Sequence, residues 1–262
     1  MRIKQCCMTK HQQKVFSGFM KRFSLKPYKD KRSPAVFYSC WGIRDLSKHK
    51  SLAVVVWRGT DVVRTKQKLN YVKNMKNVYH VAISSFIMKD LDEAGIPYKF
   101  IPLTGADMSI FKPEPLGDEI YTYIPSLYDS KSAKKYKVRY NYNLVKEIKK
   151  KCKYKINIVT GTEQYAKKEL KDIYKKCFCG LRLTKHDGLP NQVIEMGLMG
   201  RKSFYNGNIP GSIKWDSNVD NIIENIEKEY ENVGKTNISL SQQIKKFIDV
   251  GDDWLNTKFW KV

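Results

Sequence analysis

The sequence predicts an α/β protein of two domains, each built on a parallel sheet with helices on both faces. Short apolar runs alternate with helical patterns along most of the 262 residues, as they do in chains of strand–helix–strand units. Residues 112–118 (KPEPLGD) interrupt the alternation, because their two prolines and one glycine disfavour the interior of a helix or strand. We therefore expect a linker there, with domains at residues 1–115 and 116–262.

The first expected domain contains the clearest strand of the chain. Its sequence, SLAVVVW at residues 51–57, is the β-branched apolar run of a strand buried on both faces. Gly95 is expected to end a helix that follows the fourth strand, since glycine readily adopts the left-handed conformation of a helix C-terminus. The other strands are expected at residues 3–8, 35–40, 78–84 and 100–103, and a further helix at 11–23.

The second expected domain repeats the alternation, with its best strand pattern, KINIVT, at residues 155–160. Ligands of such domains bind at the carboxyl ends of the parallel strands. The other strands are expected at residues 120–125, 179–183 and 203–205, and helices at 143–151, 165–174, 190–199, 219–230 and 240–250.

The formal net charge is +23 and is unevenly distributed. Residues 1–76 hold 19 Lys and Arg but only three acids, and residues 131–155 hold 11 and one. Such basic surfaces attract polyanions, which include nucleic acid, anionic membranes and phosphorylated ligands. A generally lysine-rich proteome explains the same composition, and the sequence alone leaves both explanations open.

The remaining composition indicates a globular protein of the cytoplasm. No apolar run is long enough to cross a bilayer, and the first residues lack the apolar core of a secretory signal. The six cysteines lack the spacing of a disulfide framework or a zinc site, so we expect reduced thiols.

Residues 185–202 (KHDGLPNQVIEMGLMGRK) carry the most informative chemistry. An expected strand leads through Asp187 and Gly188 to Pro190, which suits the first helical position because its missing N–H would be unpaired there. The free amides of such a helix start attract anions. Glu195, one and a half turns along, could accept hydrogen bonds from two neighbouring hydroxyls of a ribose. A plain strand–turn–helix with a solvated carboxylate explains the same pattern.

The eight-residue spacing of Asp187 and Glu195 resembles the E-x7-E segment of retaining glycosyltransferases of the GT-B fold, with Asp in place of the first Glu. The resemblance implies that Asp187, Gly188 and Leu189 face the donor sugar and its phosphates. It also implies that Glu195 binds the ribose of the nucleotide.

A second stretch follows the order found at the end of that family's N-terminal domain. A strand ends in Ser84, a helix ends in Gly95-Ile96, and an I-P strand precedes a G-x-D…F-x-P linker that starts at Gly105. The resemblance covers roughly residues 50–210. It implies two Rossmann-like domains that face each other across a cleft.

The expected active centre departs from the family at one position. Arg58 stands where the family often has a histidine before glycine that reaches the reacting sugar, and Asp61 follows it, so we expect Arg58 and Asp61 at a strand end in the cleft. The first strand–helix turn also lacks the family's paired glycines. A salt-bridged loop pair is the alternative explanation of Arg58 and Asp61.

The resemblance also implies cations for the donor pyrophosphate. The family supplies an Arg and a Lys from the first strand–helix connection of its C-terminal domain, where we select Lys134 and Arg139 from several basic residues. Arg182 and Lys185 are further candidates near the phosphates. No metal site or tightly bound cofactor is expected. A D-x-D sequence at residues 90–92 falls on an expected helix, where the two side chains point apart.

The resemblance therefore implies a glycosyltransferase that moves a sugar from a nucleotide sugar, expected to be a UDP-sugar, and it also implies retention. The basic N-terminal domain favours an anionic acceptor, and we expect a hydroxymethylated base in duplex DNA, as for phage enzymes of similar architecture. Two alternatives stay open: transfer to a glycan or anionic lipid carrier, and a non-catalytic α/β module that binds nucleic acid. The sugar, the nucleobase, the linkage and the oligomeric state are not specified.

Overall fold

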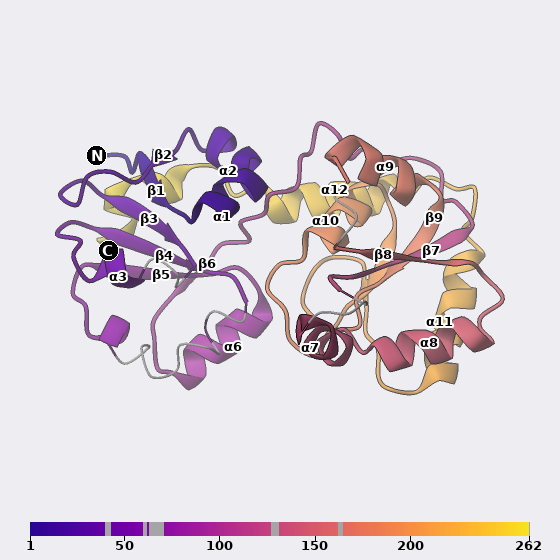
Figure 1. Cartoon of the computed structure of the whole chain (residues 1–262). Coiled ribbons are helices and arrows are strands. Elements are labelled where there is room, and N and C mark those ends of the chain that lie inside the picture. Colours follow the sequence, from indigo (N-terminus) through magenta and orange to yellow (C-terminus); the bar gives the residue numbers. More distant parts are fainter. Residues whose placement is uncertain (40–42, 60–61, 63–70, 127–130, 162–164, 262) are drawn as a thin grey trace. The chain divides into compact units, whose positions relative to one another are not determined.

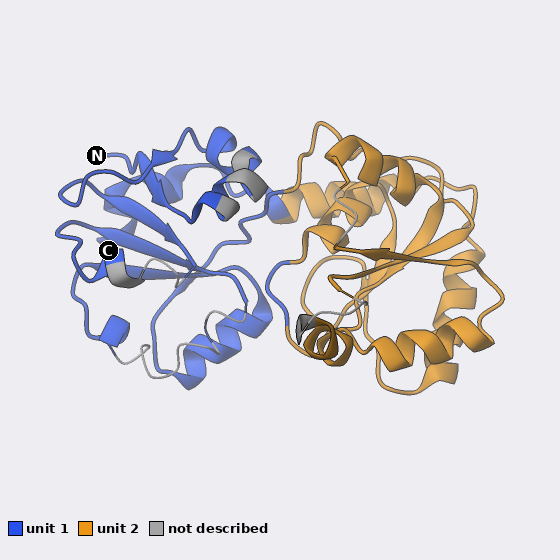
Figure 2. Cartoon of the chain, viewed as in Figure 1, with its two compact units in different colours: residues 1–105, 187–189, 248–262 blue, residues 106–186, 190–247 orange. Residues whose placement is uncertain are grey.

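The computed structural model describes the chain except residues 40–42, 60–61, 63–70, 127–130, 162–164 and 262. The chain forms two compact units (Figure 2). Contacts divide it after Gly105, earlier than the expected boundary at residue 115, and return two later segments to the first unit. Unit 1 consists of Met1–Gly105, Asp187–Leu189 and Ile248–Val262, and unit 2 of Ala106–His186 and Pro190–Phe247.

The described residues of unit 1 form a six-stranded sheet in the order β2-β1-β3-β4-β5-β6 (Figure 1). All its ladders are parallel, which confirms the predicted class of sheet. The order reverses between β1 and β3, so this is the switch point where ligands of such sheets bind. The strands are β1 (Gln5–Cys7), β2 (Lys26–Pro27), β3 (Ala35–Tyr38), β4 (Ala53–Trp57), β5 (Val78–Ala82) and β6 (Lys99–Phe100).

Side chains alternate between two covered faces of this sheet. On β4, Val55 and Trp57 pack with Leu91 of α6 (Ser85–Glu93) in one core. The opposite face packs against α1 (Lys10–Val15) and α2 (Ser17–Arg22), where the Phe19 and Tyr38 rings lie 4.7 Å apart. The expected helix at 11–23 is therefore two helices, which meet at the non-helical Phe16.

The C-terminal segment completes the core of unit 1. The short 3-10 helices η2 (Asp253–Leu255) and η3 (Thr257–Trp260) carry a buried Trp254, whose ring lies 5.2 Å from that of Phe23. The Ile3 amide donates to the Leu255 carbonyl at 2.7 Å. Burial of these apolar side chains explains why residues 248–262 pack here and not with unit 2.

The described residues of unit 2 form a second parallel sheet, in the order β11-β10-β9-β7-β8. The chain moves from β7 to one side and then crosses to β9 on the other, so the switch point lies between β7 and β9. The strands are β7 (Glu119–Ile124), β8 (Ile156–Thr160), β9 (Cys177–Leu181), β10 (Lys202–Phe204) and β11 (Ser212–Ile213).

Helices cover both faces of this sheet, as Figure 1 shows. On one face, α8 (Tyr142–Lys151) and α11 (Val219–Tyr230) bury Ile148 and Ile226 in a common core. The other face carries α9 (Lys167–Lys175), α10 (Asn191–Leu198) and α12 (Ile238–Ile248). The sequence did not predict α3 (Ile43–Leu46), α7 (Lys131–Arg139), β2 or β11.

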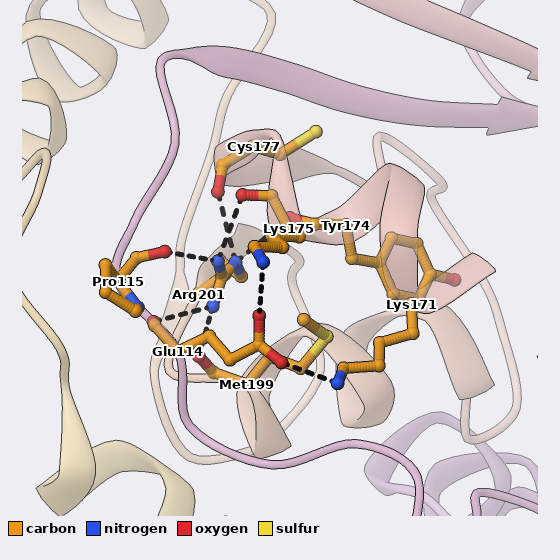
Figure 3. Close-up of polar contacts among 8 residues, drawn as sticks. All are labelled: Glu114, Pro115, Lys171, Tyr174, Lys175, Cys177, Met199 and Arg201. Atoms are coloured by element: carbon orange, nitrogen blue, oxygen red, sulfur yellow. Dashed lines mark hydrogen bonds and ion pairs between the residues drawn. The ribbon is translucent and has the colours of Figure 1, made fainter. Parts of the chain in front are cut away.

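Arg201 holds the expected linker to unit 2 at residues 114 and 115. Its guanidinium is buried and donates six hydrogen bonds, all to backbone carbonyls (Figure 3). Two acceptors are Glu114 and Pro115 of the expected linker, at 3.0 and 2.6 Å. Burial lowers the pKa of Arg201 to about 10, which leaves it charged at neutral pH. The other four carbonyls that accept hydrogen bonds from Arg201 are those of Tyr174, Lys175, Cys177 and Met199.

Candidate donor site

The candidate site of unit 2 lies at the carboxyl ends of β7 and β9. Arg182 directly follows β9, is 8% exposed, and stacks on the Tyr140 ring at 4.7 Å. Asn141 of the α7–α8 junction donates to the Leu183 carbonyl at 2.9 Å. The structure thus brings the junction that follows Arg139 to the end of β9, where Arg182 lies.

Glu195 is a residue of α10, and its side chain lies inside unit 2 against α9. It is 2% exposed, whereas the sequence pattern allowed it to reach the surface. Its Oε1 is paired with Lys167 Nζ, and its Oε2 accepts a hydrogen bond from the Tyr174 hydroxyl at 3.2 Å. Both partners lie on α9, so the carboxylate is fixed in one orientation.

Burial and charge act in opposite directions on Glu195. Burial raises the pKa of Glu195, while the charge of Lys167 and the hydrogen bonds from Lys167 and Tyr174 lower it. Burial also raises the pKa of Tyr174 and of Tyr121 on β7, and the charge of Glu195 adds to both increases. The two tyrosines therefore stay neutral, and their rings lie 4.9 Å apart.

The start of α10 departs by one residue from the predicted helix start. Pro190 is the N-cap, with extended backbone angles, and Asn191 is the first helical residue. Gln192 lies in the first turn, 7% exposed, and its Nε2 donates to the Leu181 carbonyl at 3.3 Å. Its Oε1 is buried and accepts no hydrogen bond within the described part of the chain. Gly200 follows the C-cap residue of α10 and adopts a left-handed φ of 91°.

Asp187, Gly188 and Leu189 belong to unit 1 by their contacts. The Asp187 carboxylate accepts from the Gly188 amide at 2.8 Å, and its carbonyl accepts from the Ser84 hydroxyl at 3.3 Å. A Cβ on Gly188 would overlap the carbonyl oxygen of Arg58, so this close backbone approach requires glycine. Leu189 is buried.

Arg58 directly follows β4 in the same unit. Its guanidinium carbon lies 3.7 Å from the centre of the Phe16 ring and 4.6 Å from that of Tyr38, two cation–π contacts. The backbone of Arg58 also lies next to Gly188. Asp61 lies outside the described residues.

The remaining predicted cations lie at the surface of unit 2. Lys134 is exposed on α7, Arg139 is half-buried at the end of that helix, and Lys185 is exposed four residues after β9. No sequence pattern indicated Lys167 or Tyr140. Each meets its partner, Glu195 or Arg182, across 28 or 42 residues, and only tertiary packing creates such pairs.

Three further findings concern other chemistry. Within the described part of the chain, no group of three or more His, Cys, Asp or Glu side chains could hold a metal ion. Five of the six cysteines are described, and all five are free thiols. Among the described helices, none is long and apolar enough to span a membrane.

Solved structures share this two-unit architecture. TarM aligns with a TM-score of 0.54 at 9% identity, over 96% of this chain and 56% of TarM. Sucrose-phosphate synthase from Thermosynechococcus elongatus aligns with a TM-score of 0.54 at 10% identity, over 94% of this chain and 76% of the enzyme. A glycosyltransferase from Rickettsia africae aligns with a TM-score of 0.53 at 12% identity, over 94% of both chains.

These alignments establish the fold: the chain has the two-domain GT-B architecture of glycosyltransferases. This confirms the predicted fold class. No protein-family model and no curated protein sequence matches the chain.

Proposed function

We propose that this protein is a nucleotide-sugar-dependent glycosyltransferase. The observation that carries the proposal is Glu195, a buried and hydrogen-bonded carboxylate on the helix that follows the switch-point strand of a GT-B sheet. A structural role alone gives little reason to bury an ionisable carboxylate, because an apolar side chain of similar size would avoid the loss of hydration. A ribose with two hydroxyl donors is a ligand that uses it.

The nucleotide is assigned to unit 2. Arg182, Arg139, Lys134 and Lys185 are the cations proposed for the pyrophosphate, and Arg182 has the strongest support because its guanidinium is held on Tyr140 at the end of β9. Gly188 and Leu189 are proposed to contact the donor. The solved complex of a Staphylococcus aureus TarM variant contains UDP, which favours a UDP-sugar.

The sugar-side roles are assigned to Asp187, Arg58 and Asp61. Asp187 is proposed to contact the transferred sugar, and Arg58 to stabilise negative charge beside it. Retention of the anomeric configuration follows only from the resemblance to the E-x7-E family, and is part of the proposal.

The acceptor we propose is a hydroxymethylated base in duplex DNA, which would place the reaction in the cytoplasm. Its support is a row of exposed cations on adjoining loops of unit 1, where the Lys50 amide donates to the Lys31 carbonyl at 2.9 Å. These loops precede β3 and β4, at the amino ends of the strands, so they would hold the duplex and not the target base. The cations are Lys31, Arg32, Lys48 and Lys50.

A glycan or anionic lipid carrier is the second candidate acceptor. The TarM variant complex, aligned at a TM-score of 0.53 and 10% identity, also contains fondaparinux and α-GlcNAc-glycerol. That complex favours a carbohydrate acceptor and gives no support to DNA.

The test is transfer from a panel of radiolabelled nucleotide sugars, with and without hydroxymethylated DNA, by the wild type and Glu195→Ala. Label transfer that needs DNA and is lost in the variant supports donor site and acceptor together. Donor turnover that is lost in the variant but does not depend on DNA supports the glycosyltransferase proposal. It would indicate that the acceptor is a glycan or lipid and not DNA. Absence of binding and turnover for every donor contradicts the proposal, and DNA binding alone would indicate the non-catalytic module.

A further inference from the structure

Lys167 is the first residue of α9 and forms an ion pair with Glu195 from 28 positions away in sequence. The two side chains differ sharply in exposure: Lys167 is 35% exposed and Glu195 2%. The lysine is therefore the end of the pair that reaches the surface, and the carboxylate is the end held inside.

Several groups surround this pair. Tyr174 of α9 donates to Glu195 Oε2, and Tyr121 of β7 lies behind Tyr174 with the two rings 4.9 Å apart. The Phe111 ring lies 5.6 Å from Lys167 Nζ, and Lys167 contributes to the lowered pKa of Asp107. Arg182 acts on Tyr121 electrostatically. Among these described groups, Lys167 is the cation in contact with Glu195.

The hydrogen-bonding capacity of Glu195 fits a diol. An ionised carboxylate has about four lone-pair positions, and Lys167 and Tyr174 occupy two of them, one on each oxygen. Within the described part of the chain no other group is hydrogen-bonded to this carboxylate, which leaves one position on each oxygen for a hydroxyl donor. A protonated carboxyl would lose an acceptor and gain a donor, so it could not accept from both hydroxyls of a ribose while it keeps Tyr174 and Lys167.

We propose that Lys167 is a positioning residue for nucleotide recognition, and that the Lys167–Glu195 pair, not Glu195 alone, selects ribose through its two adjacent hydroxyls. The inference rests on the proposed function and adds a residue to it. Lys167 keeps the buried carboxylate ionised and fixes its orientation, because burial without a cation favours the neutral form. The length and flexibility of the lysine side chain let it stay paired while a ribose reaches the carboxylate.

The test compares binding of a ribonucleoside diphosphate and of its 2′,3′-dideoxy counterpart by calorimetry between pH 5.5 and 8.5. The probe is whichever of UDP, ADP and GDP binds the wild type best. The ratio of the two affinities cancels ionisation of the phosphates, which both probes share. The variants are Lys167→Met, Lys167→Arg and Glu195→Gln, with Lys168→Met as the matched control because Lys168 is the next residue on α9 and is exposed.

We expect the wild type and Lys168→Met to prefer the ribose form by about 10- to 100-fold, the range for hydrogen bonds to a charged group. Lys167→Met should lose this preference at low pH and regain it as the pH rises through the increased pKa of Glu195. Lys167→Arg should restore much of it, and Glu195→Gln should lose it at every pH. A carbon-13 titration of the Glu195 carboxyl in the nucleotide-free protein should show a higher pKa for Glu195 in Lys167→Met than in the wild type.

Two outcomes overturn the inference in different ways. If the wild type prefers ribose and Lys167→Met keeps that preference at every pH, the inference fails while the transferase proposal stands. The inference also fails, with the transferase proposal unaffected, if Glu195 has the same pKa in folded Lys167→Met as in the wild type. If the wild type binds none of the three diphosphates, the proposed function fails and the inference falls with it.

Discussion

Individual side chains in this protein show how burial changes ionisation. His80, on β5, is 5% exposed, and its Nδ1 accepts a hydrogen bond from Trp57 Nε1 at 3.1 Å. The histidine is therefore held neutral in the folded protein. Burial lowers the pKa of His80 from 6.5 to about 4.

This lowered pKa predicts acid sensitivity. Above pH 6.5, the pKa of His80 in the unfolded chain, His80 is neutral in both states. Below that pH the unfolded chain binds a proton at His80, whereas the folded protein does not. The unfolding free energy therefore falls as the pH drops. Between pH 6.5 and about 4 we expect a loss of roughly 3 kcal/mol in unfolding free energy from this residue. Urea titrations of the wild type and His80→Gln across this window check it. Gln accepts the Trp57 bond but does not titrate, and equal pH slopes would contradict the prediction.

Gly188 is a second residue with a specific requirement. Because a side chain there would overlap the Arg58 carbonyl, we expect Gly188→Ala to displace the 187–189 segment. Misplaced reacting groups cost about 100-fold in rate, so sugar transfer should fall by that order while the fold survives. The control is Gly18→Ala in α2, where a Cβ meets only an ordinary contact at 3.9 Å. Equal transfer rates for both variants would disprove the requirement.

At the scale of elements, Arg201 joins parts of unit 2 that no sheet ladder connects. Its acceptors lie on the segment before β7, at the end of α9 and after α10 (Figure 3). A guanidinium offers five N–H groups in a fixed plane, which suits several carbonyls that converge on one point. The arrangement holds residues 114 and 115 to unit 2.

Replacing Arg201 should therefore destabilise unit 2 strongly. Arg201→Gln leaves buried carbonyls without donors, and we expect a loss of about 3–5 kcal/mol. Chemical denaturation followed by tryptophan fluorescence measures it. The control is the neighbouring Lys202→Gln, whose ion pair with Glu229 is partly exposed and should contribute under about 1 kcal/mol. Similar losses for the two variants would mean that the carbonyl network contributes little.

At the scale of the whole molecule, unit 1 is assembled from both ends of the described chain. The Met1 carbonyl accepts from the Thr257 amide at 2.9 Å, and Trp254 packs against Phe19 and Phe23. We expect Trp254→Ala to cost about 3–5 kcal/mol and to speed hydrogen exchange in β1 and β3 of unit 1. Trp215→Ala, in the partly buried shell of unit 2, should leave those amides unchanged. Protection of β1 and β3 that survives Trp254→Ala would contradict this role.

The distribution of charge gives a second prediction at this scale. Substituting the four loop cations (Lys31, Arg32, Lys48 and Lys50) by Gln should reduce the salt dependence of DNA binding, by about 0.9 in logarithmic slope for each phosphate that is no longer neutralised. The control triple variant replaces Lys151, Lys153 and Lys155, which are already paired with Asp220, Glu227 and Glu119. If the four-residue variant keeps the wild-type slope, the proposed DNA surface is wrong.

The sequence by itself determined the alternation of strands and helices, apart from α3, α7, β2 and β11, and the class of both sheets. Residues 219–230 were predicted as a helix and form α11 with the same bounds, and the buried run at residues 51–57 contains β4. These features follow from periodicity over a few neighbouring residues, which any local window of sequence contains. The same local pattern placed Glu195 on the helix after β9.

Only the tertiary structure decided what surrounds those residues. It buried Glu195 under Lys167, placed Arg182 on Tyr140, and returned the last residues of the chain to unit 1. Each of these contacts joins positions at least 28 residues apart in the sequence. Local periodicity carries no information about such distances, because the partners are chosen by how whole helices and sheets pack against one another.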